Sequence, residues 1–325
     1  MSIIEKAIQR QAEQHVELSD SVPTTTNLTN NSVADIAVDV SDVEKSDVEK
    51  SSFDGKVLQS ESSDKPSDAA KADSVFIDAT VSRPEAQIDL KLLEQQGFVS
   101  LSTQRRLINE EYRVIKRKLI NNAFGPLSST LKHPNLIMVS SSRPGEGKTF
   151  SSINLALSIA LEQDKTVLLV DADVLRPKVS KTLGVKHEVG LTDYLLSSNI
   201  SVADIMLNTN VPRLKLITAG TPHHLSTELL ASDRMLKLAA EFANRYADRV
   251  VIVDAPPLLG VNETSVLAAM CGQAVLVVEE NKTRLAEIEQ CVTLLPTEMA
   301  VGFLINKAHR NQGKGYGYGY YYGAE

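Results

Sequence analysis

The chain has 325 residues and a formal charge of −7, and it contains two cysteines and no tryptophan. This length suits one large α/β domain with additional segments or two domains, and no apolar run approaches the ~18 residues that span a membrane. Residues 1–95 hold 19 acidic and 9 basic side chains, so the remainder is close to neutral, and we expect no nucleic-acid partner. Cys271 and Cys291 lack metal-ligand spacing, which argues against a zinc site.

The beginning of the chain has charges at Glu5, Lys6 and Arg10, where a secretory signal peptide has an apolar stretch. We therefore expect a cytoplasmic protein that reaches the inner face of the membrane through a partner or a surface helix. Residues 1–17 predict a short helix, which is either a docking or membrane-surface helix or a frayed terminus. Residues 18–97 are rich in Ser, Thr, Asp and Lys and predict a disordered acidic linker, because they bury too little apolar surface to offset chain entropy.

Strand and helix patterns alternate after residue 98 and define a domain over residues 98–308. Most strand candidates are continuous apolar runs, as expected for strands that are covered on both faces. Strands are predicted at 135–140, 166–171, 213–219, 249–254, 273–279 and 301–306, and helices at 98–123, 149–162, 226–246, 262–271 and 283–295. This alternation indicates an α/β fold with a mainly parallel sheet and helices on both faces. Residues 309–325 follow as a flexible tail rich in glycine and tyrosine.

The stretch "SSSRPGEGKTF" joins the first strand to the next helix and matches the P-loop pattern at Gly147, Lys148 and Thr149. Ser142 stands where the strict pattern has its first glycine. Backbone N–H groups and the helix N-terminus of such a loop bind phosphate oxygens, the lysine neutralises the β- and γ-phosphates, and the Thr149 hydroxyl is available to Mg²⁺. The motif predicts a P-loop NTPase-like fold that binds ATP. Contacts to the nucleotide are expected from Gly145, Glu146, Gly147, Lys148, Thr149, Phe150 and Asn306.

Three aspartates follow predicted strands: Asp171 and Asp173 in "VLLVDADVLRP", and Asp254 in "RVVIVDAPPLLG". The carboxyl ends of parallel strands share one edge of the sheet, so these side chains are expected beside the P-loop. Mg²⁺ binds a few carboxylates together with water and phosphate oxygens, and the predicted metal ligands are the three aspartates and Thr149. Each aspartate is a metal ligand, a base for an incoming hydroxyl group, or both. Together with Lys148 they form the predicted catalytic set.

In these motifs the chain resembles the bacterial tyrosine kinases, which carry a P-loop, a D-x-D motif, a D-x-P-P motif and a C-terminal tyrosine cluster. The corresponding stretches here are "SRPGEGKT", "LLVDAD", "VIVDAPP" and "YGYGYYY", and the resemblance covers about residues 98–325. It implies a tyrosine autokinase that uses ATP and Mg²⁺, and the amino-terminal part looks most like the soluble autokinases of exosortase-type exopolysaccharide systems. The family's D-x-D motif usually continues to an arginine at the position of Leu175, whereas here Arg176 follows one residue later. Asn306 sits where related P-loop ATPases contact adenine, or it ends its strand for turn reasons alone.

The family's oligomerisation motif, E-x-x-R-x-x-R on the first helix, corresponds here to Glu110, Arg113 and Lys116. The last arginine is replaced by lysine, which cannot pair bidentately with a carboxylate. Read without the family, these residues are the charged face of an amphipathic helix.

The carboxyl end "GKGYGYGYYYGAE" contains most of the tyrosines of the chain. We hypothesise that these tyrosines are phosphorylated in trans within a homo-oligomeric ring, and that the added charge of about −1.5 to −2 per phosphate loosens the ring. The alternative is that the tail is an aromatic low-complexity end that binds another molecule or has no role. The resemblance implies phosphorylation of the tail. It also implies a transmembrane polysaccharide co-polymerase as activator and a protein-tyrosine phosphatase as further partners. The predicted phosphorylation sites are Tyr316, Tyr318, Tyr320, Tyr321 and Tyr322.

Two other functions are compatible with the same motifs. P-loop ATPases of the partitioning or positioning class share the sheet and the D-x-D stretch, and they carry a signature lysine where this chain has Arg143. A nucleotide-gated scaffold for a membrane exporter would use the tail as a docking peptide. The first alternative gives no reason for the tyrosine cluster, and the second predicts nucleotide binding without phosphate transfer.

Overall fold

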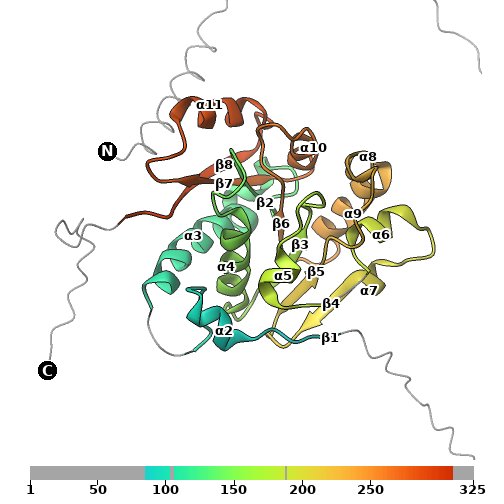
Figure 1. Ribbon diagram of the computed structural model, residues 1–325, viewed down its shortest axis with the longest axis horizontal. Helices are drawn as coiled ribbons and strands as arrows, with labels where there is room; N and C mark the ends of the chain where they lie inside the picture. Colours follow the sequence, from blue (N-terminus) through green and yellow to red (C-terminus); the bar gives the residue numbers. More distant parts are fainter. Residues whose placement is uncertain (1–84, 103–105, 187–188, 310–325) are drawn as a thin grey trace, which may run out of the picture. The chain divides into compact units, whose positions relative to one another are not determined.

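Eight strands form a single sheet in the order β1-β4-β5-β3-β6-β2-β7-β8 (Figure 1). The computed structural model describes residues 85–102, 106–186 and 189–309. The helix predicted over residues 1–17 and the tyrosines of the tail lie outside the described residues. The strands are β1 (Glu85–Ala86), β2 (Leu136–Ser141), β3 (Thr166–Asp171), β4 (Met206–Thr209), β5 (Leu214–Ile217), β6 (Arg249–Asp254), β7 (Gln273–Glu279) and β8 (Ala300–Asn306).

Six strands are parallel to one another, in the order β5-β3-β6-β2-β7-β8. β4 pairs antiparallel with β5, because only residues 210–213 join the two strands and so short a connection permits a hairpin but no crossover. β1 pairs parallel with β4. The predicted mainly parallel sheet is therefore confirmed. The apolar pattern missed the antiparallel strand β4, because two of its four residues, Asn208 and Thr209, are polar.

Helices cover both faces of the sheet (Figure 1). Residues of α2 to α5 pack on one face, in the core cluster around Ile137 and Leu169. Residues of α6 to α11 pack on the other face, around Met138 and Leu168, so alternate residues of β2 and β3 point to opposite faces. The helices are α2 (Leu90–Gln95), α3 (Leu107–Phe124), α4 (Lys148–Ala160), α5 (Val179–Leu183), α6 (Leu191–Leu196), α7 (Val202–Ile205), α8 (Ser226–Leu230), α9 (Asp233–Asn244), α10 (Glu263–Ala268) and α11 (Leu285–Thr293).

The helix predicted over residues 226–246 is divided into α8 and α9. The first helix ends at Leu230 with Ala231 as its C-cap. Ser232 begins the second helix as its N-cap, because its side chain accepts a hydrogen bond from the Met235 N–H group. The helix predicted over residues 98–123 begins later, at Leu107.

Residues 85–97, which the sequence assigned to the acidic linker, contain β1 and α2. Asn210 holds this segment by exchanging hydrogen bonds with the backbone of Ile88, at 2.9 and 3.0 Å. Asn154 of α4 accepts a hydrogen bond of 2.7 Å from the Val99 N–H group. The apolar side chains of Ile88 and Leu93 are buried in the core, which the polar composition of the surrounding linker concealed.

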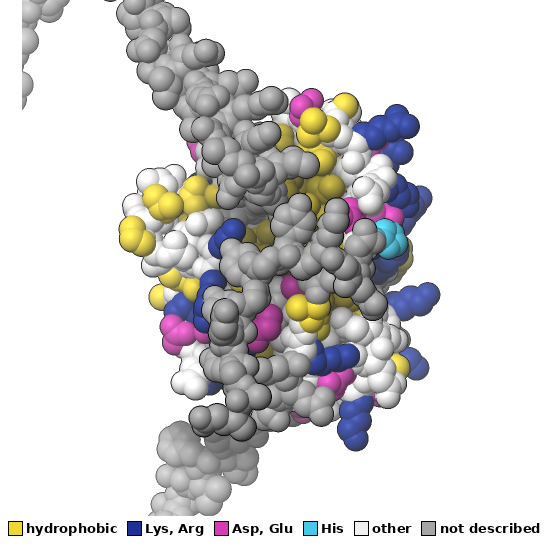
Figure 2. Space-filling view, turned by 90° about the vertical axis from the view of Figure 1, so that its left-hand side faces the viewer, with side chains coloured by type: hydrophobic (Ala, Val, Ile, Leu, Met, Phe, Trp, Pro, Cys, Tyr) yellow, Lys and Arg dark blue, Asp and Glu magenta, His cyan; other side chains and the backbone are white. Residues whose placement is uncertain are grey.

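The face of the molecule in Figure 2 carries Lys and Arg side chains with Asp and Glu side chains between them, and its hydrophobic side chains form small separate groups. None of the described helices is long and apolar enough to cross a membrane.

Candidate nucleotide site

The P-loop connects the end of β2 to the start of α4, at the carboxyl edge of the sheet (Figure 1). Gly145 and Gly147 have φ angles of 91° and 106°, in the left-handed region that glycine adopts without steric cost. A side chain at Gly147 would also collide with the amide nitrogen of Asn306. The loop therefore requires glycine at position 147 for its backbone conformation, and a side chain there would also displace the Asn306 amide.

The outer side of the P-loop is bound to the neighbouring strands by side chains. The Glu146 carboxylate is buried and accepts hydrogen bonds from the Arg143 N–H group at 2.9 Å and from the Thr283 hydroxyl at 2.5 Å. Asn306 donates to the Glu146 carbonyl at 2.9 Å, and Lys307 donates to the Gly145 carbonyl at 2.8 Å. Of the predicted nucleotide contacts, the side chains of Glu146 and Asn306 thus fix the shape of the loop.

Lys148 and Asp173 form a buried ion pair, with 2.5 Å between Nζ and Oδ2. The P-loop supplies the lysine, and the segment after β3 supplies the aspartate. The other carboxylate oxygen of Asp173 accepts a hydrogen bond of 3.1 Å from the Arg176 N–H group. The structure therefore brings together two members of the predicted catalytic set, and the Lys148 amine is held where the loop opens into α4.

Asp254 ends β6 and is completely buried. Its two carboxylate oxygens accept hydrogen bonds from the hydroxyl groups of Thr149 at 2.8 Å and Ser152 at 2.9 Å. Burial raises the pKa of Asp254, and the Lys148 charge and the two hydroxyl donors oppose this rise. Sequence reasoning missed Ser152, although it lies one helical turn after Thr149 and so on the same face of α4.

Asp171 ends β3 and lies directly opposite Asp254 in the pairing of β3 with β6. Its carboxylate oxygens accept hydrogen bonds from two backbone N–H groups, those of Asp173 at 3.3 Å and Val179 at 3.1 Å. Burial and, to a smaller extent, the charge of Asp254 raise the pKa of Asp171 to about 8. The side chain has no exposed surface, so it fixes the loop between β3 and α5 and is not open to an incoming substrate in this structure.

The predicted metal ligands lie near one another, but each aspartate has its own set of partners. Among the described residues, no group of three His, Cys, Asp or Glu side chains has an arrangement that could hold a metal ion. The contact between Thr149 and Asp254 is compatible with Mg²⁺, because this ion needs few protein ligands when phosphate oxygens and water complete its shell.

Phe150 faces the core, away from the P-loop. Its ring lies 4.7 Å from the ring of Phe98, at an interplanar angle of 48°, so it joins α4 to the segment that precedes α3. Its side chain therefore has a packing role, and only its backbone is available to a nucleotide.

Leu175, at the departure from the family's D-x-D pattern, is 51% exposed.

The residues of the family's oligomerisation motif lie on α3, apart from the P-loop contacts. Glu110 and Arg113 are exposed and form an ion pair of 2.7 Å with each other. Lys116 is buried; it donates to the Ser158 carbonyl at 2.6 Å and pairs with Glu162 at 2.8 Å. This lysine joins α3 to the α4 region within the chain, so the structure does not present it to a second subunit as the sequence pattern suggested.

Residues 134–295 match the AAA domain family, which covers the sheet from β2 to β7. The tyrosine-protein kinase YwqD of Bacillus subtilis is 32% identical over 203 residues, which are 62% of this chain and 81% of that protein. The chain belongs to the bacterial tyrosine kinase family. Its fold is of the P-loop NTPase type, which implies nucleotide binding.

Other members of the bacterial tyrosine kinase family are also similar to this chain. The putative tyrosine-protein kinase EpsB of Ralstonia solanacearum is 37% identical over 161 residues, which are 50% of this chain and 21% of that protein. The kinase domain of the Escherichia coli tyrosine kinase ETK superposes with a TM-score of 0.57 at 27% identity, over 73% of this chain and 94% of that domain. The BceF tyrosine kinase domain gives a TM-score of 0.55 at 26% identity, over 68% and 90% of the respective chains.

Proposed function

We propose that this protein is an ATP-dependent protein-tyrosine autokinase that phosphorylates its own tyrosines at positions 316–322. The strongest support is the set of contacts at the start of α4, where Lys148 meets Asp173 and Thr149 meets Asp254. These side chains occupy the positions that phosphate binding and phosphoryl transfer require in a P-loop protein. Five of the eight tyrosines lie in 316–322, which gives the site a protein acceptor in the same chain.

The P-loop backbone and Lys148 would bind the β- and γ-phosphates, since the loop presents N–H groups at a helix N-terminus. Thr149 and Asp254 would hold Mg²⁺, which when bound supplies positive charge to the phosphate oxygens. Ser152 keeps the Asp254 carboxylate in position through its second oxygen.

Asp173 is the aspartate that we assign as the base for the tyrosine. Phosphate oxygens compete with this carboxylate for the Lys148 amine, so nucleotide binding would release Asp173 from its ion pair. The carboxylate then accepts the phenol proton while the phenol oxygen forms a bond to the γ-phosphorus and the bond from that phosphorus to the bridging oxygen breaks. ADP leaves with the bridging oxygen. Asp171 is less suited to this role because two backbone N–H groups already occupy its buried carboxylate.

Transfer in trans is supported by the position of β8. This strand ends at Asn306, at the same sheet edge as the P-loop, and ten extended residues beyond it reach at most ~35 Å. That reach would allow the tail to enter the site of a neighbouring subunit in a ring. Glu110 and Arg113 are exposed on α3 and available for such a subunit contact.

The process that we propose for this kinase is the regulation of exopolysaccharide synthesis or export. Its relatives include proteins named CpsD, from Streptococcus agalactiae, and a putative tyrosine-protein kinase in the cps region of Klebsiella pneumoniae. A transmembrane co-polymerase would activate the kinase and recruit it from the cytoplasm to the membrane, and a protein-tyrosine phosphatase would reverse the reaction.

Intact-mass measurement tests the proposed activity. The dephosphorylated protein is incubated with Mg²⁺ and ATP beside a Lys148→Met control, and phosphates are mapped by peptide analysis. Phosphates on residues 316–322 that are absent from the control support the autokinase. Phosphate released into solution without a mass change would instead indicate an ATPase of the positioning class. Nucleotide binding without either product would indicate a scaffold. Before that conclusion, the assay is repeated with a cytoplasmic peptide of the activator.

A mixing experiment tests the transfer in trans. The Lys148→Met protein, which keeps its tyrosines, is combined with a variant that has phenylalanine in place of the five tail tyrosines. Phosphate on the Lys148→Met chain would establish transfer between subunits. A rate per molecule that does not depend on protein concentration, with no phosphate on that chain, would contradict it.

A further inference from the structure

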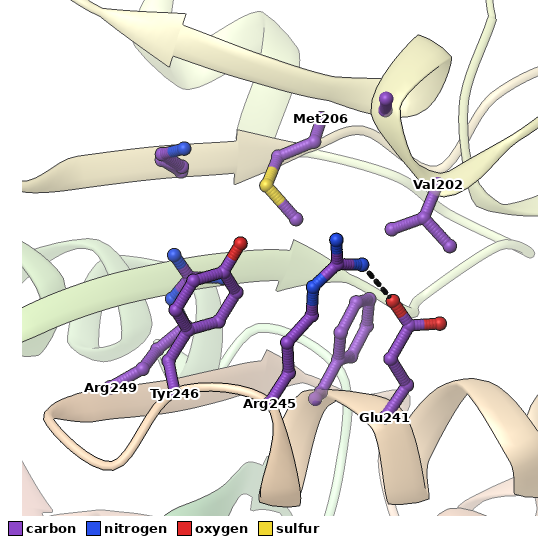
Figure 3. Close-up of a pocket in the computed structure, with 9 residues that line it drawn as sticks. Val202, Met206, Glu241, Arg245, Tyr246 and Arg249 are labelled. Atoms are coloured by element: carbon purple, nitrogen blue, oxygen red, sulfur yellow. Dashed lines mark hydrogen bonds and ion pairs between the residues drawn. The ribbon is translucent and has the colours of Figure 1, made fainter. Parts of the chain in front are cut away.

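A small cavity lies between α7, β5 and the turn from α9 into β6, shown in Figure 3. Its volume is about 50 Å³, which suits a group of a few heavy atoms and is too small for a nucleotide. Arg249 is the first residue of β6 and Asp254 the last, so the strand places the cavity roughly 17 Å from the carboxyl edge of the sheet. The cavity is therefore separate from the P-loop site.

Basic side chains dominate the polar lining of this cavity. Lys215, Arg245 and Arg249 contribute three positive charges, and Glu241 contributes one negative charge. Glu241 and Arg245 form an ion pair with each other. The lining itself therefore carries more positive than negative charge, which suits an anion.

Arg249 has the most unusual environment of these residues. It is 95% buried, since only 5% of its surface is exposed, and its guanidinium group lies 3.7 Å from the centroid of the Tyr246 ring. Its Nε atom has no hydrogen-bond partner among the described residues. Burial lowers the pKa of Arg249, and the neighbouring Tyr246 and Asp248 side chains offset this only in part. A buried cation with an unused donor is unfavourable unless another group completes its bonding.

The other donors are arranged around the same ring. In Figure 3 the Tyr246 hydroxyl and the Arg245 guanidinium group point toward Met206, while the Arg249 guanidinium group lies behind the Tyr246 ring. The Arg245 guanidinium group is 5.7 Å from the ring centroid. Val202 and Met206 close the opposite side with apolar atoms. An occupant would thus meet N–H and O–H donors on one side and hydrocarbon on the other.

We propose that this cavity binds a phosphate-type oxyanion through Arg249, Arg245 and Lys215, with the Tyr246 hydroxyl as a further donor. The guanidinium group matches the geometry of phosphate oxygens and forms charge-assisted hydrogen bonds with them. The ligand is either free inorganic phosphate or the phosphoryl group of a modified side chain. The volume admits the oxyanion and excludes an aromatic ring, so a phosphotyrosine would insert its phosphate alone.

Nuclear magnetic resonance of the full-length protein labelled with ¹⁵N-arginine tests the proposal, because each arginine Nε–H group gives its own signal. The Arg249 signal is identified by its absence from the Arg249→Lys variant. Inorganic phosphate and O-phosphotyrosine are titrated separately at constant ionic strength, with sodium chloride as the reference. Saturating Mg²⁺–ADP is present throughout, so that the P-loop is occupied in every titration.

We expect the Arg249 signal to move to saturation with at least one of the two ligands. We also expect the Kd to rise about tenfold or more in Arg245→Gln, because one charge-assisted hydrogen-bonding group is lost. Lys237→Gln is the matched control, since Lys237 is an exposed cation on the same helix and does not line the cavity. The tighter of the two ligands identifies the source of the phosphate group.

A signal that moves as much with chloride as with phosphate would reduce the effect to screening and overturn the proposal. The same holds if the Kd is equal in the unmodified protein and in Arg245→Gln, or if Lys237→Gln weakens binding as much as Arg245→Gln does. These measurements do not involve phosphoryl transfer, so their result is independent of the proposed kinase activity.

Discussion

The two ends of β6 carry buried charges in opposite states. At the carboxyl end, Asp254 accepts hydrogen bonds from Thr149 and Ser152 on both of its oxygens. At the amino end, Arg249 is stacked on Tyr246, but its Nε atom has no partner in the described part of the chain. A buried charge is tolerated when it is paired and fully hydrogen-bonded. The comparison teaches that the chain completes the bonding of Asp254 by itself and leaves bonding capacity at Arg249 for a ligand.

Removal of the P-loop lysine is expected to have the largest effect. Lys148→Met should lower the rate of tyrosine phosphorylation by at least about a thousandfold, because the developing charge on the phosphate loses its buried cation. The initial rate of phosphate incorporation into residues 316–322 measures this. Lys307→Met is the control, since Lys307 contacts the outside of the same loop through the Gly145 carbonyl. Equal losses in both variants would mean that loop shape, and not the lysine charge, limits the rate.

The next effect concerns the two aspartates of the D-x-D motif. Asp173→Asn should reduce kcat by about 10²–10⁴-fold, because it removes the proposed base, and it should not raise the KM for ATP, because it also removes the carboxylate that competes with phosphate for Lys148. Asp171→Asn should instead lower the free energy of unfolding by about 1–3 kcal/mol, because one of two backbone N–H groups loses its acceptor. Single-turnover rates and urea unfolding separate the two. A larger loss of kcat in Asp171→Asn than in Asp173→Asn would reverse our assignment of the base.

A stability measurement compares the two ends of β6 directly. Asp254→Leu should lower the free energy of unfolding by about 3–5 kcal/mol. The Thr149 and Ser152 hydroxyl groups lose their buried acceptor, and Lys148 loses the nearby negative charge of Asp254. Arg249→Met, in phosphate-free buffer, should change it by no more than about 1 kcal/mol, because the lost stacking on Tyr246 is offset by removal of an incompletely bonded cation. Urea unfolding of both variants measures the contrast. Equal losses would show that Arg249 is as fully bonded as Asp254.

The smallest effect is expected at Ser152, which sharpens the carboxyl end of the comparison. Ser152→Ala removes one of the two hydroxyl donors to Asp254 and should cost about 1 kcal/mol of stability. Thermal unfolding detects it as a lower melting temperature. Ser129→Ala is the matched control, because the Ser129 hydroxyl is exposed and makes a long hydrogen bond of 3.4 Å to the Pro126 carbonyl. Ser129→Ala should therefore be nearly neutral, and a loss equal to that of Ser152→Ala would remove the assigned role of Ser152.

Local sequence determined the nucleotide edge of this protein. Continuous apolar runs specify buried parallel strands, and the residues that follow such strands must meet at one edge of the sheet, so Lys148, Asp173 and Asp254 were predictable neighbours. Gly147 was equally predictable, since the loop needs its backbone freedom. The roles of Glu146 and Phe150 were not, because a motif gives the position of a side chain along the chain but not the direction in which it points.

The tertiary structure alone decided the features that depend on contacts between distant segments. Lys116 lies on the same buried stripe of α3 as Tyr112 and Leu119, so helix periodicity separates it from the exposed Arg117. The tertiary structure supplies the partners of its charge, Ser158 and Glu162, which lie in another segment. The cavity at Arg249 joins α7, β5 and the end of α9, which residues 206–213 and 218–232 separate in the sequence. A continuous apolar run is a local property that can be read from the sequence, whereas the partners of a buried charge depend on packing between different segments. That is the physical reason why the phosphate edge was predictable and the amino end of β6 was not.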